Sequence, residues 1–327
     1  MHNKIAVLAL VALLQLVVIA WFWFGSDAET QDSVTLLSFD TEQVDLLTIS
    51  SPDSQVQIKK TEQGWRVTDA PADDEKVTTL LDKLAGLQAP WPVATSADVA
   101  QRFEVAEDNY QRLVSLRQGD EILAQAYLGT SPGYQRVHAR AAGQDDVYSV
   151  QLSNYELGLE IDAWLDKAVM AIDETVTRVD YVPSAVSAQL LEQVIGEDGA
   201  AIWQINGESA DATKAETYVN RFGNLRVLGL ADDKLVSQAT LVAQLTVQTA
   251  SESYVYEILA TYTTGSETDT VQTEADQAAP AAVGEQTDTA REVDNYLIRR
   301  QGVSQVYRLA TYVAEQLLMQ DTDFISI

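Results

Sequence analysis

The feature that most constrains the fold of this chain is an internal repeat built around two tryptophans. Trp65 and Trp203 each end a strand-like run, and an amphipathic stripe with the spacing of a helix begins 12 residues beyond each of them. Asp73 and Asp211 precede the stripes, where an acidic side chain caps a helix. The stripes are Val77, Leu80, Leu81, Leu84 and Leu87, and Ala215, Tyr218, Val219, Phe222 and Leu225. This self-similarity predicts a duplicated unit.

Strand patterns follow both stripes, and each set leads into a further helical pattern. The order hairpin, helix, antiparallel strands, helix favours an α+β class over a βαβ arrangement. The predicted helices are Ser153–Leu165 and Thr311–Met319. The predicted strands are Arg112–Leu116, Ile122–Leu128, Gln135–Arg140 and Val147–Val150 in the first half, and Thr240–Gln248, Tyr254–Tyr262, Tyr296–Arg300 and Val306–Leu309 in the second.

The second half carries an additional segment, Thr264–Asp294, between two predicted strands. It is rich in acids, Thr, Ala and Gln and has no aromatic residue. Such a composition buries too little apolar surface to offset the entropy of ordering, so we expect a disordered loop. An acidic docking segment or a weak calcium site is the alternative. The spacing of a calcium-binding EF-hand loop is missing, which argues against the calcium site.

Length and charge narrow the classes of function. The 327 residues are enough for two domains, and 46% hydrophobic residues with 21% charged residues indicate a folded chain. The formal net charge of −28 repels phosphate backbones, so we expect no nucleic-acid partner. The simpler interpretation of this charge is an acidic surface that keeps the protein soluble. The functional interpretation is a binding partner with a basic surface. Because there is no Cys, disulfides and thiol chemistry are excluded.

Residues 5–24 form an apolar run that predicts a membrane anchor. The run has one polar member, Gln15, and is about 30 Å long as a helix, which matches a bilayer core. Lys4 precedes it and acids follow it, so the positive-inside rule predicts a cytoplasmic N-terminus and an extracytoplasmic bulk. A cleaved signal peptide ending near Ser26-Asp27-Ala28 is the alternative. The apolar core of a signal peptide is usually shorter than residues 5–24, which argues against cleavage.

One pattern matches a catalytic motif. Gly129–Gly133 reads Gly-Thr-Ser-Pro-Gly, which fits the G-x-S-x-G of serine hydrolases, and His138 follows it. A nucleophilic Ser131 needs a turn from a strand into a helix, whereas this segment joins two predicted strands. We therefore expect a plain turn.

No other motif points to chemistry. The chain has no P-loop, no dinucleotide fingerprint and no H-E-x-x-H pattern, and its paired acids fall in turns or at helix starts. We predict no catalytic, cofactor-binding or metal-binding residues and no cofactor, and hence a protein that is not an enzyme. Trp91, between two prolines, is the expected exposed aromatic.

The ordered motifs of the first half resemble the bacterial domain-of-unknown-function family 4340. They are Gly64-Trp65, the acid-led helix Asp73–Leu87, Tyr127-Leu128-Gly129, the strand Tyr134–Val137 and Val147-Tyr148. The usual Tyr-Gly-Leu before the third strand is replaced here by Phe103-Glu104-Val105. The family has no assigned activity. The resemblance implies an association with ABC-type export systems of the gliding-motility type.

These observations together predict a membrane-anchored α+β protein. It would have a cytoplasmic tip and transmembrane helix in residues 1–25, a first repeat in 26–170, and a second repeat in 171–327 with the insertion at 264–294. Each repeat would hold antiparallel strands and two helices. We expect an accessory or scaffold subunit at the inner membrane, attached through residues 5–24 and in contact with ABC-type transporter subunits. A binding protein or enzyme for an envelope glycan or peptide is the alternative.

Overall fold

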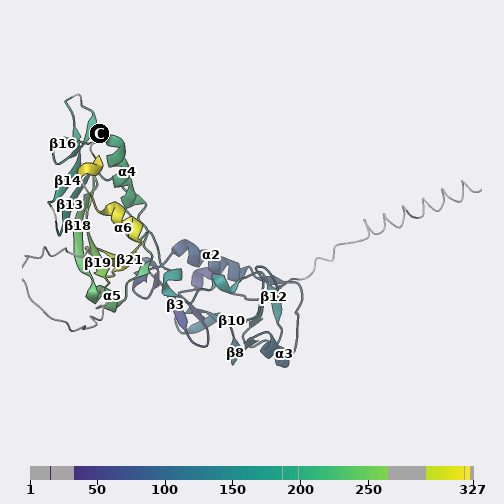
Figure 1. The fold of residues 1–327 in the computed structure, drawn as a ribbon. Helices are drawn as coiled ribbons and strands as arrows, with labels where there is room; N and C mark the ends of the chain where they lie inside the picture. Colours follow the sequence, from purple (N-terminus) through teal and green to yellow (C-terminus); the bar gives the residue numbers. More distant parts are fainter. Residues whose placement is uncertain are drawn as a thin grey trace, which may run out of the picture. The chain divides into compact units, whose positions relative to one another are not determined.

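The computed structural model describes residues 15, 33–185, 187–197, 199–263, 292–319 and 321–324 (Figure 1). This part of the chain is mostly antiparallel β-sheet. The contacts within it group the chain into two compact units. The first comprises Met1–Gln55 with Thr78–Leu157, and the second comprises Val56–Val77 with Gly158–Ile327.

The first unit contains five strands that neighbour one another in the order β12-β11-β10-β9-β2, all antiparallel. Two short pairs, β1 with β6 and β7 with β8, accompany them. The strands are β1 (Val34–Thr35), β2 (Leu46–Ser50), β6 (Gln88–Ala89), β7 (Val105–Ala106), β8 (Asn109–Tyr110), β9 (Arg112–Gln118), β10 (Glu121–Leu128), β11 (Val137–Ala141) and β12 (Tyr148–Val150). The helical elements are α3 (Ala97–Arg102), η1 (Thr41–Gln43) and η2 (Asn154–Glu156). Helix α2 (Asp74–Ala85) begins in the second unit and ends in the first.

The second unit contains the antiparallel meander β3-β4-β5 and a large sheet in the order β16-β15-β14-β13-β18-β19-β20-β21-β17. The strands are β3 (Gln55–Thr61), β4 (Gly64–Val67), β5 (Ala70–Pro71), β13 (Arg178–Pro183), β14 (Gln189–Ile195), β15 (Ala201–Ile205), β16 (Glu208–Ser209), β17 (Gly229–Leu230), β18 (Thr240–Gln248), β19 (Ser253–Tyr262), β20 (Val293–Arg300) and β21 (Tyr307–Leu309). The helical elements are α4 (Ala212–Gly223), α5 (Asp233–Gln238), α6 (Thr311–Leu317), η3 (Ile161–Ala163) and η4 (Asp321–Phe324).

The predicted amphipathic helices form, and aspartates cap them. Asp73 Oδ1 accepts a hydrogen bond from the backbone N–H of Lys76 at 2.9 Å, and Asp211 Oδ1 accepts one from Lys214 at 3.1 Å. These bonds satisfy donors that the first turn of a helix leaves without a partner. The stripe of α4 is buried, and this helix contacts β15 and α6. Burial of one apolar face fixes the helix on the sheet.

The strand order β12-β11-β10-β9-β2 is the same as β21-β20-β19-β18-β13, and the meander β3-β4-β5 matches β14-β15-β16. The registers match as well. Across the sheets, the row Arg112, Leu128, Ala139, Tyr148 corresponds to the row Ala243, Ile258, Ile298, Tyr307. The two tryptophans are also alike, since both are buried and each carbonyl accepts a hydrogen bond from the residue seven positions later, Ala72 or Ala210. The two sets of elements thus share one topology. The boundary after Met170 stays a prediction.

The expected α+β class with an N-terminal transmembrane helix is wrong for the described part of the chain. Sheet dominates, and none of the described helices is long and apolar enough to cross a membrane. The segment that we predicted to supply that helix, residues 5–24, lies outside the described residues except for Gln15.

The predicted helix Ser153–Leu165 is also wrong, because the segment forms the two short turns η2 and η3. Its apolar residues have helical spacing, but Gly158 interrupts the pattern, and glycine costs about 1 kcal/mol in a helix interior. The Gly158 carbonyl instead accepts a hydrogen bond from Trp164 Nε1 at 2.9 Å. The side chain of Trp164 is fully buried by this arrangement.

Most of the acidic insertion lies outside the described residues, which leave out 264–291. Its last residues, Val293 and Asp294, belong to β20, so this strand begins earlier than the sequence predicted. The insertion connects β19 to β20. The equivalent connection in the first unit, between β10 and β11, is the turn that contains Ser131.

A comparison of the two equivalent hairpin turns yields a prediction about stability. Asn206-Gly207 joins β15 to β16 with positive φ angles of 52° and 84°, whereas the β4–β5 turn places Thr68 at φ 52°. Asn tolerates this left-handed conformation and a β-branched residue does not. Thr68→Asn should therefore raise the free energy of unfolding by about 1 kcal/mol, and Asn206→Thr should lower it by at least as much. Urea denaturation measures both, with Thr68→Val as a control that keeps the strain. An equal gain from Thr68→Val would contradict the explanation.

Candidate functional site

The structure places Ser131, the one candidate nucleophile, in the turn between β10 and β11. Its Oγ lies 2.8 Å from the carbonyl oxygen of Gly133 and 2.7 Å from that of Arg136, so its single hydroxyl proton is shared between these two acceptors. The hydroxyl therefore braces the turn. No helix follows the serine, so the strand-to-helix turn that a nucleophile elbow requires is missing from this segment.

The glycine that opens the motif has a packing role. A Cβ added at Gly129 would lie 2.0 Å from the carbonyl oxygen of Phe103 and 2.4 Å from that of Glu104. The backbone of residues 129–130 runs against this segment, and Thr130 N–H donates to the Phe103 carbonyl at 2.9 Å. At Gly133, by contrast, an added Cβ meets nothing within 4 Å. Close backbone approach accounts for the first glycine without any catalytic role.

His138 does not act on Ser131. It lies in β11, is buried, and its Nδ1 is 2.9 Å from Thr130 Oγ1. Burial lowers its pKa below the usual value, and a hydrogen bond to the backbone of Thr130 opposes this shift. The ring packs against Phe103 with centroids 4.2 Å apart. Its surroundings are those of a neutral core histidine.

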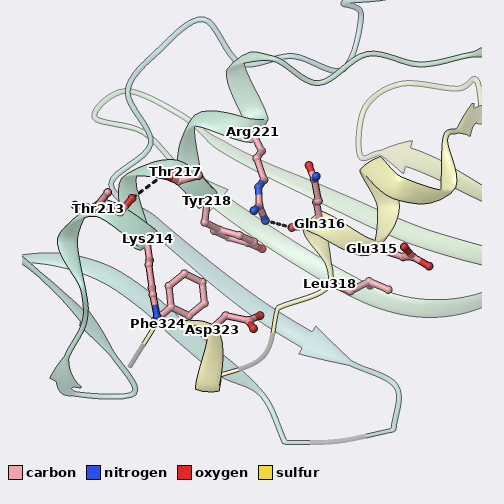
Figure 2. A pocket seen from close by; sticks show the side chains of 10 residues that line it. All are labelled: Thr213, Lys214, Thr217, Tyr218, Arg221, Glu315, Gln316, Leu318, Asp323 and Phe324. Carbon is pink, nitrogen blue, oxygen red and sulfur yellow. Dashed lines mark hydrogen bonds between the residues drawn. The ribbon is translucent and has the colours of Figure 1, made fainter. Parts of the chain in front are cut away.

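The second unit has a groove of about 400 Å³ beside α4 and α6 (Figure 2). Its floor is Tyr218, whose hydroxyl donates to the Leu317 carbonyl at 2.9 Å. Burial raises the pKa of Tyr218 far above the usual range, so the group is a neutral donor. The Arg221 guanidinium stacks over the Tyr218 ring and donates to the carbonyl of Gln316 (Figure 2).

The charges in this groove are balanced. Lys214 and Arg221 face Glu315 and Asp323 around the same opening (Figure 2). The hydrogen bonds of Tyr218 and Arg221 described above run from α4 to the carbonyls of Leu317 and Gln316, and they hold α4 against the C-terminal part of the unit. We read it as a structural groove at the end of the second unit.

A further groove of about 480 Å³ lies on the second sheet at the β20–β21 turn. Arg299 on its wall pairs with Glu257, and the Arg300 guanidinium lies 5.6 Å from the centroid of the Tyr254 ring. In the first unit, a groove of about 350 Å³ lies beside Ser131. Sequence patterns do not predict these grooves, because the residues that line each of them come from segments that only the folded chain brings together. Within the described residues, no group of three or more His, Asp and Glu side chains could hold a metal ion.

Comparison with protein families gives one match, over residues 65–244, to the family described as "Domain of unknown function (DUF4340)". The chain belongs to this family. Comparisons with curated proteins and with solved structures gave no match. The family resemblance seen in the sequence is thus confirmed.

The structure explains the DUF4340 motifs as packing requirements. Gly64 has φ +100°, and an added Cβ would lie 2.7 Å from the carboxylate of Asp74, whose Oδ1 accepts the Trp65 N–H at 2.7 Å. Glu104 has φ +57° and occupies the position where the family usually has glycine. Trp91 is exposed, as predicted. Gly64 and Glu104 thus mark tight backbone positions.

These contacts predict how the motif responds to substitution. Ser131→Ala should lower the free energy of unfolding by about 1 kcal/mol, the usual value for one hydrogen bond, and a fluorophosphonate serine probe should not label the unmodified protein. Gly129→Ala should cost about 3 kcal/mol, because the added methyl meets two backbone carbonyls. Gly133→Ala is the matched control and should change stability little. Stoichiometric labelling of Ser131 would contradict this assignment.

Proposed function

We propose that this protein is a non-enzymatic, extracytoplasmic accessory or scaffold subunit of an envelope ABC-type transport system. The observation that carries the non-enzymatic part is that the Ser131 hydroxyl donates its one proton to backbone carbonyls of its own turn, which gives the one catalytic-type motif a structural role. The link to an ABC-type system rests on the resemblance to the DUF4340 family.

A scaffold role is supported by the large sheets and by the exposed aliphatic side chains on the second of them. Two sets of strands with one topology provide extended sheet surfaces in the part of the chain that the structure describes. Several aliphatic side chains in the second sheet are exposed, among them Val182 at 50% and Ile195 at 74%. Exposed apolar side chains on strands are the type of surface that protein partners cover.

The location is part of the proposal. Its support is the apolar character of residues 5–24 and the charges that flank them, Lys4 before and Asp27 and Glu29 after. Attachment to the inner membrane through residues 5–24 stays a prediction, because this segment lies outside the described residues apart from Gln15.

The location is tested with a reporter enzyme that is active only outside the cytoplasm. Fused after Ile327, it should be active in cells. The same fusion made on a chain that lacks residues 5–24 should be inactive, because the export signal is then missing. Activity of a cytoplasm-specific reporter at Ile327 would contradict the extracytoplasmic location.

The partner is tested by crosslinking in native membranes, followed by purification of the intact chain and identification of what accompanies it. We expect subunits of an ABC-type transporter at a ratio close to one per chain. The Ser131→Ala variant is the control and should recover the same partners, because the proposal gives this hydroxyl no role in contact. Recovery of envelope-glycan enzymes in place of transporter subunits would favour the alternative function.

A further inference from the structure

A polar groove in the first unit has the properties of a ligand site. It measures about 350 Å³ and lies where the start of β9, the β10–β11 turn and η2 meet. Gln111 and Arg112 come from the first of these, Gln135 and Arg136 from the second, and Asn154 and Tyr155 from the third.

Its charge distinguishes this groove from the two others described above. Arg112 and Arg136 line it, and no acidic residue does. Neither guanidinium is in an ion pair with any carboxylate of the described residues, although the chain has 49 acids against 21 bases. The groove beside α4 and the groove at the β20–β21 turn both carry acids next to their arginines.

Backbone carbonyls hold both guanidinium groups in place. Arg112 Nε donates to the Leu157 carbonyl at 3.2 Å, and its Nη1 donates to the Gln111 carbonyl at 2.7 Å. Arg136 Nε donates to Ser149 Oγ at 2.9 Å, and its Nη2 donates to the Ser149 carbonyl. Each guanidinium has further N–H groups, and a planar fork already fixed in position matches a carboxylate well.

The remaining lining suits a polyhydroxylated ring. The amides of Gln111 and Asn154 are bonded to each other, because Asn154 Nδ2 donates to Gln111 Oε1 at 2.7 Å. The Gln135 amide, on the exposed turn, offers donor and acceptor groups to hydroxyls. Tyr155 is 95% exposed, but its backbone is fixed, because Ser153 caps η2 and the Tyr155 N–H donates to Ser153 Oγ at 3.3 Å. An exposed aromatic ring on a fixed backbone provides a flat apolar face at little cost in entropy.

We propose that this groove binds an acidic saccharide. The carboxylate pairs with Arg112 and Arg136, a hydroxyl bonds to the amide of Gln135, and the sugar ring lies against Tyr155. This inference goes beyond the proposed accessory function, which does not require a ligand, and its failure would leave that function intact.

Within the described residues, the second unit does not repeat Arg112. In the matched rows of the two sheets, Arg112 corresponds to Ala243, and the short turn that carries Arg136 corresponds to the connection between β19 and β20 that holds the insertion. The proposal therefore predicts one binding site per chain.

The test is a ligand-observed NMR titration of the full chain with D-glucuronate, D-glucose and acetate. We expect glucuronate to bind at one site per chain, and glucose and acetate to bind at least about tenfold more weakly, because each lacks one part of the recognition. Arg112→Gln with Arg136→Gln should weaken glucuronate binding by at least about tenfold. Arg102→Gln, the same substitution at one exposed position in the same unit, should leave it unchanged.

Tyr155→Ala keeps the test decisive if the double arginine variant fails to fold, since this side chain is almost fully exposed. It should weaken the binding of glucuronate and leave that of acetate unchanged. Equal binding of acetate and glucuronate would mean a simple carboxylate site and overturn the proposal. Undiminished glucuronate binding by the folded arginine variant would overturn it as well.

Discussion

The same long-range hydrogen bond occurs in both repeats. It connects the residue before the helix α2 or α4 to a residue near the C-terminal end of the same repeat. Asp73 N–H donates to the carbonyl of Trp164 at 2.8 Å, and Asp211 N–H donates to that of Phe324 at 2.9 Å. Both aromatic side chains are buried, so an unpaired carbonyl at either position would carry a large desolvation cost. The same aspartates cap their helices. The position of each helix therefore depends on residues far along the chain being in place, which couples helix formation to closure of the sheet.

Periodicity in the sequence predicted much of this fold. The strand Thr240–Gln248 forms with the predicted bounds, and both amphipathic helices lie within a few residues of their expected positions. These elements have one buried face, so local pattern and tertiary burial agree. Ser153–Leu165 failed because its helical spacing of apolar residues competes with Gly158, whose carbonyl is required by Trp164. A hydrogen bond between an indole and a carbonyl leaves no periodic trace in the sequence.

The candidate site was less predictable than the fold. The G-x-S-x-G pattern was correctly interpreted as a turn, because residue type and flanking strands decide that locally. The arginine groove was missed, because Arg112 and Arg136 are ordinary strand and turn residues until β9 and β11 are placed on either side of β10. That no acidic residue lines this groove is a property of the folded surface and not of the local sequence. In a chain with a net charge of −28, only the structure reveals which bases lack a partner.

Duplication explains how one chain can contain two different surfaces on the same topology. Both halves have a buried tyrosine at the same register position of the last strand, Tyr148 in the first half and Tyr307 in the second. The differences lie in the connection that follows β10 or β19, where one half has a braced turn and the other has the acidic insertion. Loops at a sheet end can change in length at small cost, because closure entropy grows slowly with loop length. The core therefore constrains the topology in both halves, while the connection at one end of the sheet is free to diverge in length and composition.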